Sequence, residues 1–342
     1  MICSEEKTRF FSQPKVDVVG SAADPRTHIY QLAESGMMVR YANIKSKKGG
    51  EPIEILQFTD THLNKMNERD VEENDPVVAS TRIYRLAPRF RDEATVPSTK
   101  AAMALAPYFD QTVVSGDVID YITWGSLELM KEIVVDPCPN VLMPIAMHDL
   151  VRKMQGTVEE NTTLEERWEI VKPYWPHDIF YESRVLGDKV MVVALNNCVG
   201  KYYDHQTEKF KADLERARRE DLIVLIYQHE AMCTHNPKEK ELIVLRQDVR
   251  TVDPLTPYNF YENFCGNDRD TDEESKRLYD LIYSNGDIIK GVFCGHEHCD
   301  IYNEIVAYYY DEKGNKIDTV IPQYTLTGNM YQQGHILIVT VD

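Results

Sequence analysis

The chain has 342 residues, a formal net charge of −18, 43% hydrophobic residues and 27% charged residues. This composition is typical of a globular protein with a large core and excludes wholesale disorder. A surface this acidic repels nucleic-acid backbones, and no stretch of the chain clusters more than a few Lys or Arg residues. We therefore predict that the protein has no nucleic-acid partner.

The sequence also restricts membrane attachment and redox state. It contains no run of about eighteen apolar residues, so we predict no membrane-spanning segment and no membrane partner. Residues 1–7 do not resemble a secretory signal, which predicts a cytoplasmic protein, although a chain trimmed of its signal would look the same. The seven cysteines lack the spacing of a disulfide framework or a zinc ribbon, so we expect them to be reduced. Nothing in the sequence indicates an oligomeric state.

The predicted organisation is a short leader followed by one domain. Residues 1–51 are predicted to form an N-terminal leader whose strand, at 37–44, packs on a sheet edge, and residues 52–342 form the domain. Between the predicted strands, a polar excursion at 63–98 is expected to wall a site. The segment 232–270, rich in Pro, Asn and aromatic residues, is predicted to be a cap.

Predicted helices alternate with strands along most of the domain. They span 99–108, 126–133, 162–171, 206–220 and 271–283, and the last begins with the capping-box pattern Thr271-Asp-Glu-Glu274. The final third changes character, because residues 304–310 and 317–324 flank a hairpin signal and residues 335–341 alternate like a last strand. We therefore predict an α/β fold with antiparallel C-terminal strands.

Five apolar, strand-like runs are each followed closely by Asp or His residues. Side chains at strand ends are held by a rigid scaffold yet open to solvent, which is where ligands and catalytic groups tend to lie. The runs and the residues after them are 53–58 with Asp60 and His62; 112–115 with Asp117 and Asp120; 141–145 with His148 and Asp149; 222–227 with His229; and 288–294 with His296 and His298. This repetition predicts a metal centre on the rim of a sheet.

Taken singly, most of these pieces carry little information. Asp60-x-His62 and Gly116-Asp117 are common turn sequences with solvated Asp residues. The segment Gly295-His-Glu-His298 is more specific, since two His residues at this spacing are poor turn residues but good ligands for divalent metals. Five of the ten histidines follow the apolar runs, and no role is indicated for the others, which are His28, His177, His205, His235 and His335.

The ordered set of motifs resembles the calcineurin-like metallophosphoesterase superfamily. The order is Asp-x-His, Gly-Asp-x-x-Asp, His-Asp, a lone His after a strand and Gly-His-x-His, and the resemblance covers roughly residues 53–300. Members include purple acid phosphatases, serine/threonine phosphatases, cyclic-nucleotide phosphodiesterases, nucleotidases and repair nucleases. The resemblance implies a central β-sandwich flanked by helices, in four αββα layers, with two metal ions at one edge.

The resemblance also implies roles for individual residues. Asp60, His62 and His298 would hold the first metal ion, Asp117 would bridge the two ions, and His229 and His296 would hold the second. Mixed carboxylate and imidazole ligands suit Mn, Fe or Zn better than Ca. His148 lies where the family has a proton donor to the leaving oxygen, and the carboxylate of Asp120 would orient and charge its imidazole by accepting the other N–H.

At one motif the chain departs from the family pattern. The family has Gly-Asn before this His, whereas the chain has Ala146-Met147. The Asn amide oxygen normally binds the second metal, and a thioether is a weak ligand for hard ions, so a weaker second site is implied. Two interpretations stay open: Met147 is a core residue at the end of a buried strand, or the second site is weakened or inactivated.

Two further features have alternative interpretations. Cys294 and Cys299 flank the last motif and could form a Cys/His zinc site. The simpler assignment is that Cys294 is a core residue of the strand and that Cys299 has no role in the site. The aromatic cluster at 258–264 could stack on a nucleotide, although such clusters are more often packed within the protein.

We therefore expect a metal-dependent phosphoesterase that hydrolyses a small phosphomonoester or phosphodiester by attack of a metal-bound hydroxide. The alternative is a metal-binding relative that has weakened or lost catalysis through Ala146 and Met147 and acts as a ligand-binding protein. A nuclease is disfavoured by the acidity of the chain. The sequence does not identify the substrate.

Overall fold

The structure is a computed structural model. It describes residues 38–78, 92–152, 162–198, 201–232, 250–251, 273–298, 300–329 and 334–342. Almost all of the predicted cap at 232–270, including the aromatic cluster at 258–264, lies outside the described residues, as do Cys299 and residues 1–37 of the predicted leader. Within the described part of the chain, no helix is long and apolar enough to cross a membrane.

Two β-sheets form the centre of the fold. The smaller sheet has the strand order β1-β11-β2-β3, and the larger has the order β4-β5-β6-β8-β10-β9-β7. The strands of the smaller sheet are β1 (Met38–Ile44), β2 (Ile53–Phe58), β3 (Gln111–Val114) and β11 (His335–Val341). Those of the larger sheet are β4 (Tyr181–Leu186), β5 (Val190–Leu195), β6 (Ile223–Tyr227), β7 (Arg250–Thr251), β8 (Ile289–Cys294), β9 (Ile301–Tyr310) and β10 (Lys316–Thr325).

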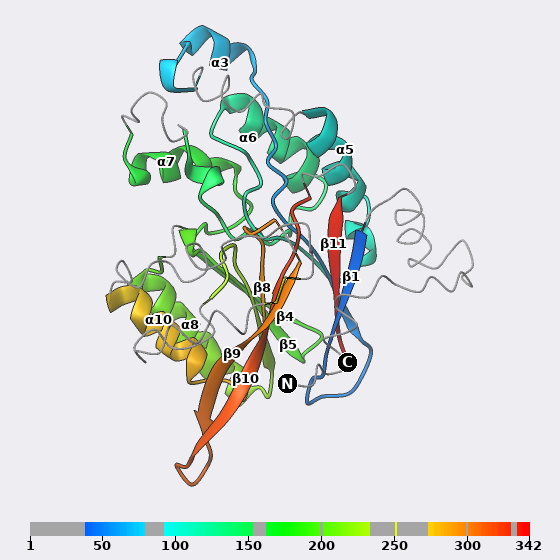
Figure 1. Ribbon diagram of the computed structural model, residues 1–342, viewed down its shortest axis with the longest axis vertical. Coiled ribbons are helices and arrows are strands. Elements are labelled where there is room, and N and C mark those ends of the chain that lie inside the picture. The colour runs from blue at the N-terminus through cyan, green and yellow to red at the C-terminus, as the bar shows by residue number, and fades with distance from the viewer. Residues whose placement is uncertain are drawn as a thin grey trace, which may run out of the picture.

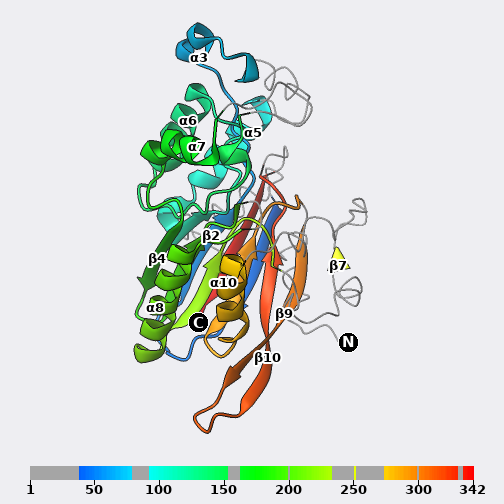
Figure 2. The same ribbon diagram turned by 90° about the vertical axis from the view of Figure 1, so that its left-hand side faces the viewer.

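Helices flank the two sheets (Figures 1 and 2). Figure 1 shows α8 and α10 side by side along the larger sheet, and α5, α6 and α7 at the upper end of the molecule. The α-helices named in this article are α3 (Glu68–Glu73), α5 (Asp92–Met103), α6 (Trp124–Met130), α7 (Leu164–Val171), α8 (Asp204–Arg219) and α10 (Glu273–Tyr283).

Three hydrophobic clusters hold these layers together. Strand β2 shows why the layers form: Ile55 faces the cluster between the sheets, whereas Leu56 and Phe58 face the cluster beneath α5 and α6. A strand buried on both faces reads as a continuous apolar run because its side chains alternate between the faces. In the third cluster, Phe210 of α8 and Ile282 of α10 pack on the outer side of the larger sheet. The predicted four-layer α/β class is confirmed.

The predicted C-terminal strands are also present. Strands β9 and β10 pair antiparallel around the loop at 311–315, and β11 pairs antiparallel with β2. The predicted strand at 37–44 is β1, which lies at the edge of the smaller sheet and pairs parallel with β11. Strands β4 and β5 were not among the predicted strands.

The apolar run 141–145 differs from the prediction, because it is not a strand. Only Leu142 bridges to Val113 of β3, and Pro144 has no N–H for a longer ladder. Side chains hold the segment instead: the N–H of Met143 donates to Nε2 of His177 at 2.8 Å, and Nε1 of Trp175 donates to the carbonyl of Met143 at 2.7 Å. The position of the following His148 therefore depends on side-chain contacts.

The contact of His177 predicts a pH effect on stability. Burial lowers the pKa of His177 from 6.5 to about 4, and its Nε2 accepts a hydrogen bond, which requires the neutral ring. The unfolded chain binds this proton near pH 6.5 and the folded chain only near pH 4, so the folded state loses stability as the pH falls between these values. The expected loss is about 3 kcal/mol.

Denaturant unfolding of the metal-free chain and of His177→Gln, at pH 7 and at pH 4, measures this effect. All other titrating groups are common to both proteins, so the difference in unfolding free energy between them isolates His177. That difference should shrink by about 3 kcal/mol at the lower pH. A difference independent of pH would contradict the assignment of a neutral, hydrogen-bonded ring.

Candidate metal centre

The predicted site residues follow four strands whose carboxyl ends meet between the two sheets. Strands β2 and β3 are parallel neighbours in the smaller sheet, and β6 and β8 are parallel neighbours in the larger one. Parallel neighbours end at the same edge of a sheet, so the residues that follow them converge. The residues in question are Asp60 and His62 after β2, Asp117 after β3, His229 after β6, and His296 and His298 after β8.

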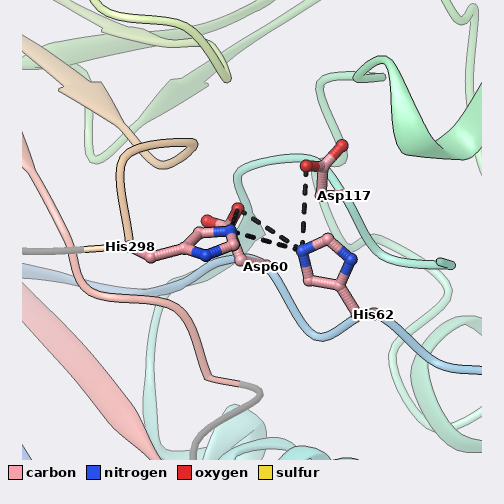
Figure 3. A group of neighbouring side chains, drawn as sticks. All are labelled: Asp60, His62, Asp117 and His298. Atoms are coloured by element: carbon pink, nitrogen blue, oxygen red, sulfur yellow. Dashed lines mark hydrogen bonds and ion pairs between the residues drawn. The ribbon is translucent and has the colours of Figure 1, made fainter. Parts of the chain in front are cut away.

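One group contains Asp60, His62, Asp117 and His298, whose ligand atoms all lie within 4.8 Å of one another (Figure 3). Nε2 of His298 lies 3.0 Å from Oδ1 of Asp60. Nε2 of His62 lies 3.8 Å from Oδ1 of Asp60 and 3.8 Å from Oδ2 of Asp117. Two carboxylates and two imidazoles thus face a common point.

A second group contains Asp117, His229 and His296. Nε2 of His229 lies 3.1 Å from Oδ2 of Asp117, and Nδ1 of His296 lies 3.3 Å from Nε2 of His229. Asp117 therefore belongs to both groups, and the same oxygen, Oδ2, faces an imidazole of each.

The Nδ1 atoms of two imidazoles have hydrogen-bonding partners that orient the rings. Nδ1 of His62 is 3.1 Å from Oδ1 of Asp120, and Nδ1 of His229 is 2.7 Å from the carbonyl oxygen of Ser115. When Nδ1 carries the proton, Nε2 keeps its lone pair for a metal ion, which is the usual arrangement of histidine ligands.

The site also meets a test for a bound cation. Oδ1 of Asp60 is buried and accepts no hydrogen bond of ordinary geometry, whereas Oδ2 accepts from Thr59 Oγ1 at 2.7 Å and from the N–H of His296 at 3.1 Å. An unsatisfied carboxylate oxygen is costly in the interior. Because three imidazole Nε2 atoms lie within 3.9 Å of it, those of His62, His229 and His298, the donor set fits a divalent ion.

Charges within the cluster shift the imidazole pKa values upward. Burial lowers the pKa of His229, but the charges of Asp117 and Asp60 outweigh burial and raise it to about 10. Burial likewise lowers the pKa of His62, but the hydrogen bond to Asp120 and the nearby carboxylates of Asp60 and Asp117 raise it to about 9. A divalent ion supplies the same positive charge that these protons supply, so metal binding at neutral pH should release protons.

Backbone strain is concentrated at the same residues. Among the described residues, eight other than glycine have a positive φ, and five of the eight belong to the two ligand groups. These five are Asp60 (51°), His62 (45°), Asp117 (49°), His296 (73°) and His298 (52°). Each left-handed residue costs on the order of 1 kcal/mol, and such strain persists where the surrounding structure imposes it, commonly at functional sites.

Two glycines of the sequence motifs are required for close packing here. A Cβ on Gly295 would lie 1.9 Å from Oγ1 of Thr59 and 2.5 Å from Oδ2 of Asp60. A Cβ on Gly116, whose φ is 86°, would lie 2.6 Å from Nδ1 of His229. These glycines let the backbone approach the ligand side chains.

His148 and Asp120 lie beside the first group, and the ring of His148 is 4.7 Å from that of His62. Nδ1 of His148 lies 2.8 Å from the backbone carbonyl oxygen of Asp120 and 3.5 Å from its Oδ1. Asp120 thus contacts His148 mainly through its backbone, whereas the expectation was a contact through the carboxylate. The shorter carboxylate contact, to Nδ1 of His62, explains the difference.

The structure tests one of the two interpretations of Met147, the one that makes it a core residue at the end of a buried strand. Met147 is 41% exposed, so the core interpretation is wrong. It begins the 3₁₀ turn at His148–Leu150 with φ −65° and ψ −42°, a backbone that any residue adopts. The N–H of His148 donates to Oδ1 of Asp117 at 3.0 Å, which ties this turn to the ligand shared by both groups.

Asp149 and Asn197 have structural roles at the site that the sequence did not predict. Oδ1 of Asp149 accepts from the N–H groups of Val118 and Ile119, and Oδ2 accepts from that of Ala146. Burial and the charge of Asp117 raise the pKa of Asp149 to about 7. Asp149 thereby joins the loop of Asp117 to the loop of His148.

Asn197 plays a similar role at the second group. Its Oδ1 accepts from the N–H groups of His229 and Glu230, and its Nδ2 donates to the carbonyl of Glu230. The sequence signal was available, because Asn196 and Asn197 directly follow the apolar run of β5.

Proteins similar to this chain are found only among solved structures. No family model matches the chain, and no curated protein matches it. A dimetal phosphatase from Danio rerio is similar with a TM-score of 0.41 and 11% identity, covering 82% of this chain and 89% of that one. A purple acid phosphatase from yellow lupin seeds has a TM-score of 0.39 and 16% identity, covering 85% of this chain and 44% of that one.

A third similar structure is that of a Staphylococcus aureus protein provisionally assigned as a 5′-nucleotidase, with a TM-score of 0.35 and 11% identity, covering 80% of this chain and 54% of that one. The chain thus spans about half the length of the last two proteins. The fold and the clustered Asp and His residues define a two-sheet α/β protein with a candidate metal centre.

Proposed function

We propose that the protein is a metal-dependent phosphoesterase of the calcineurin-like superfamily that hydrolyses a small phosphomonoester or phosphodiester. The observation that carries the proposal is the sharing of Asp117 by two groups of ligand side chains. A carboxylate common to two such groups is the arrangement that holds two divalent ions side by side.

The side chains divide between two ions as follows. Asp60, His62 and His298 would hold the first ion, His229 and His296 would hold the second, and Asp117 would be shared by the two. Imidazole and carboxylate ligands suit Mn, Fe or Zn. When bound, such ions supply Lewis-acid chemistry, neutralising the charge of phosphate oxygens and acidifying a water molecule.

His148 is the proton donor to the leaving oxygen. Its Nδ1 contact with Asp120 fixes the ring, and its side chain is 19% exposed, so the ring is accessible to a substrate. Asp120 contacts the imidazoles of both His62 and His148, and therefore sets the distance between a metal ligand and the acid. No Ser or Cys nucleophile is required.

The charge of the chain favours small substrates. A net charge of −18 opposes the approach of a polyanion, and a nuclease would need a basic groove that the sequence does not provide. We propose that the excursion at 63–98 and the cap at 232–270 determine whether the substrate is a monoester or a diester.

Metal content and hydrolysis, measured together, test the proposal. The purified chain loaded with Mn²⁺ should retain two ions per chain and hydrolyse at least one member of a panel of aryl, sugar and nucleotide phosphate esters. Chelation should abolish the activity, and added Mn²⁺ should restore it. Failure to retain any ion would refute the proposal.

The exposed Met147 supports a second candidate function, a metal-binding relative with little turnover that binds a phosphorylated ligand. A thioether replaces the amide oxygen expected beside the second ion, although Asp117, His229 and His296 still provide three protein ligands. The double variant Ala146→Gly with Met147→Asn separates the two candidates. An active parent protein should change by less than about tenfold, roughly 1.4 kcal/mol; a large gain from near-zero turnover would favour the second candidate.

A further inference from the structure

A buried ion pair joins the edge strand β1 to the segment that follows His298. Nε of Arg40 donates to Oδ2 of Asp300 at 2.9 Å, and Nη2 of Arg40 lies 2.8 Å from the same oxygen. Arg40 is 8% exposed and Asp300 is 5% exposed. Removing both charges from water is costly, so an ion pair at this depth adds little net stability, and a role in fixing position has to be considered.

The second oxygen of Asp300 holds another segment of the chain. Oδ1 accepts from the backbone N–H of Thr327 and from its Oγ1, each at 3.0 Å. Asp300 is only two residues from His298, so one carboxylate fixes the chain after a ligand of the first group and the segment 327–329 together. Arg40 restrains that carboxylate through Oδ2.

The segment 327–329 lies directly against two ligands of the first group. A Cβ on Gly328 would be 2.9 Å from Cβ of Asp60 and 3.6 Å from Cδ2 of His298. The next residue, Asn329, is fully buried, and its N–H donates to the carbonyl of Thr59 at 2.7 Å. The segment is thus fixed at both ends, by Asp300 at Thr327 and by the residue before Asp60 at Asn329.

The contacts made by Asp300 and the segment 327–329 differ between the two ligand groups. They reach Asp60 and His298, whereas His229 is held by Ser115 and Asn197, which belong to other loops. A change at Arg40 or Asp300 should therefore affect the two groups differently.

We propose that the Arg40–Asp300 pair is a clamp that positions Asp60 and His298 for the first metal ion, so that strand β1 sets the affinity of that ion. The inference rests on the proposed function in one respect, that the cluster binds metal. Arg40, Asp300 and Thr327 are positioning residues: they act through the ligands and touch no ion themselves. Residues that orient metal ligands commonly change affinity by about 10- to 100-fold.

Separate measurement of each ion provides the test. In full-length chains carrying His296→Ala only the first ligand group is complete, and in chains carrying His298→Ala only the second is. Asp300→Asn is added to each background, and the dissociation constant of Mn²⁺ is measured by calorimetry after chelation. We expect weakening of about 10- to 100-fold in the first background and less than about threefold in the second.

Three further variants separate positioning from loss of folding. Arg40→Met with Asp300→Leu removes the pair without leaving one buried charge alone, and should still weaken the first ion, because Thr327 loses its acceptor. Leu214→Ala, in the core beneath α8, should lower the unfolding midpoint without changing either Mn²⁺ affinity. Arg40→Lys, which keeps a positive charge beside Asp300, should weaken the first ion less than this double variant does.

Equal weakening in both backgrounds, or none in the first, would overturn the clamp while leaving the metal centre intact. Absence of Mn²⁺ binding in both backgrounds and in the unaltered chain would overturn the clamp and the proposed function together.

Discussion

Asp117→Asn is expected to remove both metal ions, since Oδ2 of Asp117 faces His62 at 3.8 Å and His229 at 3.1 Å. An amide can still accept the hydrogen bond from the N–H of His148, which Oδ1 now accepts at 3.0 Å, so the loop should keep its shape. The amide lacks the negative charge that balances two divalent ions. We expect affinity for Mn²⁺ to fall by more than about 100-fold for both ions, with loss of hydrolysis.

Metal analysis of the purified variant and calorimetric titration with Mn²⁺ provide the readout. Asp136→Asn is a suitable control, because Asp136 is an exposed carboxylate that pairs with Lys131 outside the ligand groups. The control should keep the parental metal content. If Asp117→Asn still retained two ions per chain, the assignment of Asp117 to both ions would be wrong.

His148→Ala is expected to reduce turnover by a factor that depends on the leaving group. Proton donation by a positioned side chain contributes on the order of 10²- to 10⁴-fold, but only when the leaving oxygen needs a proton. Alkyl phosphate esters should therefore lose on the order of 10³-fold, whereas activated aryl phosphates should lose less than about tenfold. Because His148 belongs to neither ligand group of Asp117, the metal content should not change.

Turnover of matched alkyl and nitrophenyl esters measures this ratio directly. His205→Ala is the control, since His205 packs against Phe180 and Tyr203, and should affect the two esters alike. Equal losses on both esters in His148→Ala would assign His148 a structural role and exclude proton donation.

Much of the fold and most of the candidate site followed from local sequence patterns. Buried strands such as β2 and β6 read as apolar runs because both faces are covered, and the ligand side chains come directly after these runs. Glycine before Asp117 and before His296 reflects space that a Cβ would occupy. These features are local in the chain, so a single sequence can reveal them.

Other features depended on contacts between distant segments. The run at 141–145 has the composition of a strand, but Pro144 and the side chains of Trp175 and His177 hold it in another form. Composition also did not reveal that Met147 is exposed, because a methionine after an apolar run is compatible with either environment.

The sequence by itself determined the α/β class, four of the strands that precede the Asp and His residues, and the residue types of a candidate divalent-metal site. The tertiary structure alone decided which atoms meet: Asp117 in both groups, the carboxylate of Asp120 with His62, and Arg40 with Asp300. The physical reason is sequence distance. Arg40 and Asp300 are 260 residues apart, and Arg40 belongs to β1 of the smaller sheet whereas Asp300 precedes β9 of the larger one, so their contact forms only when the two sheets pack together.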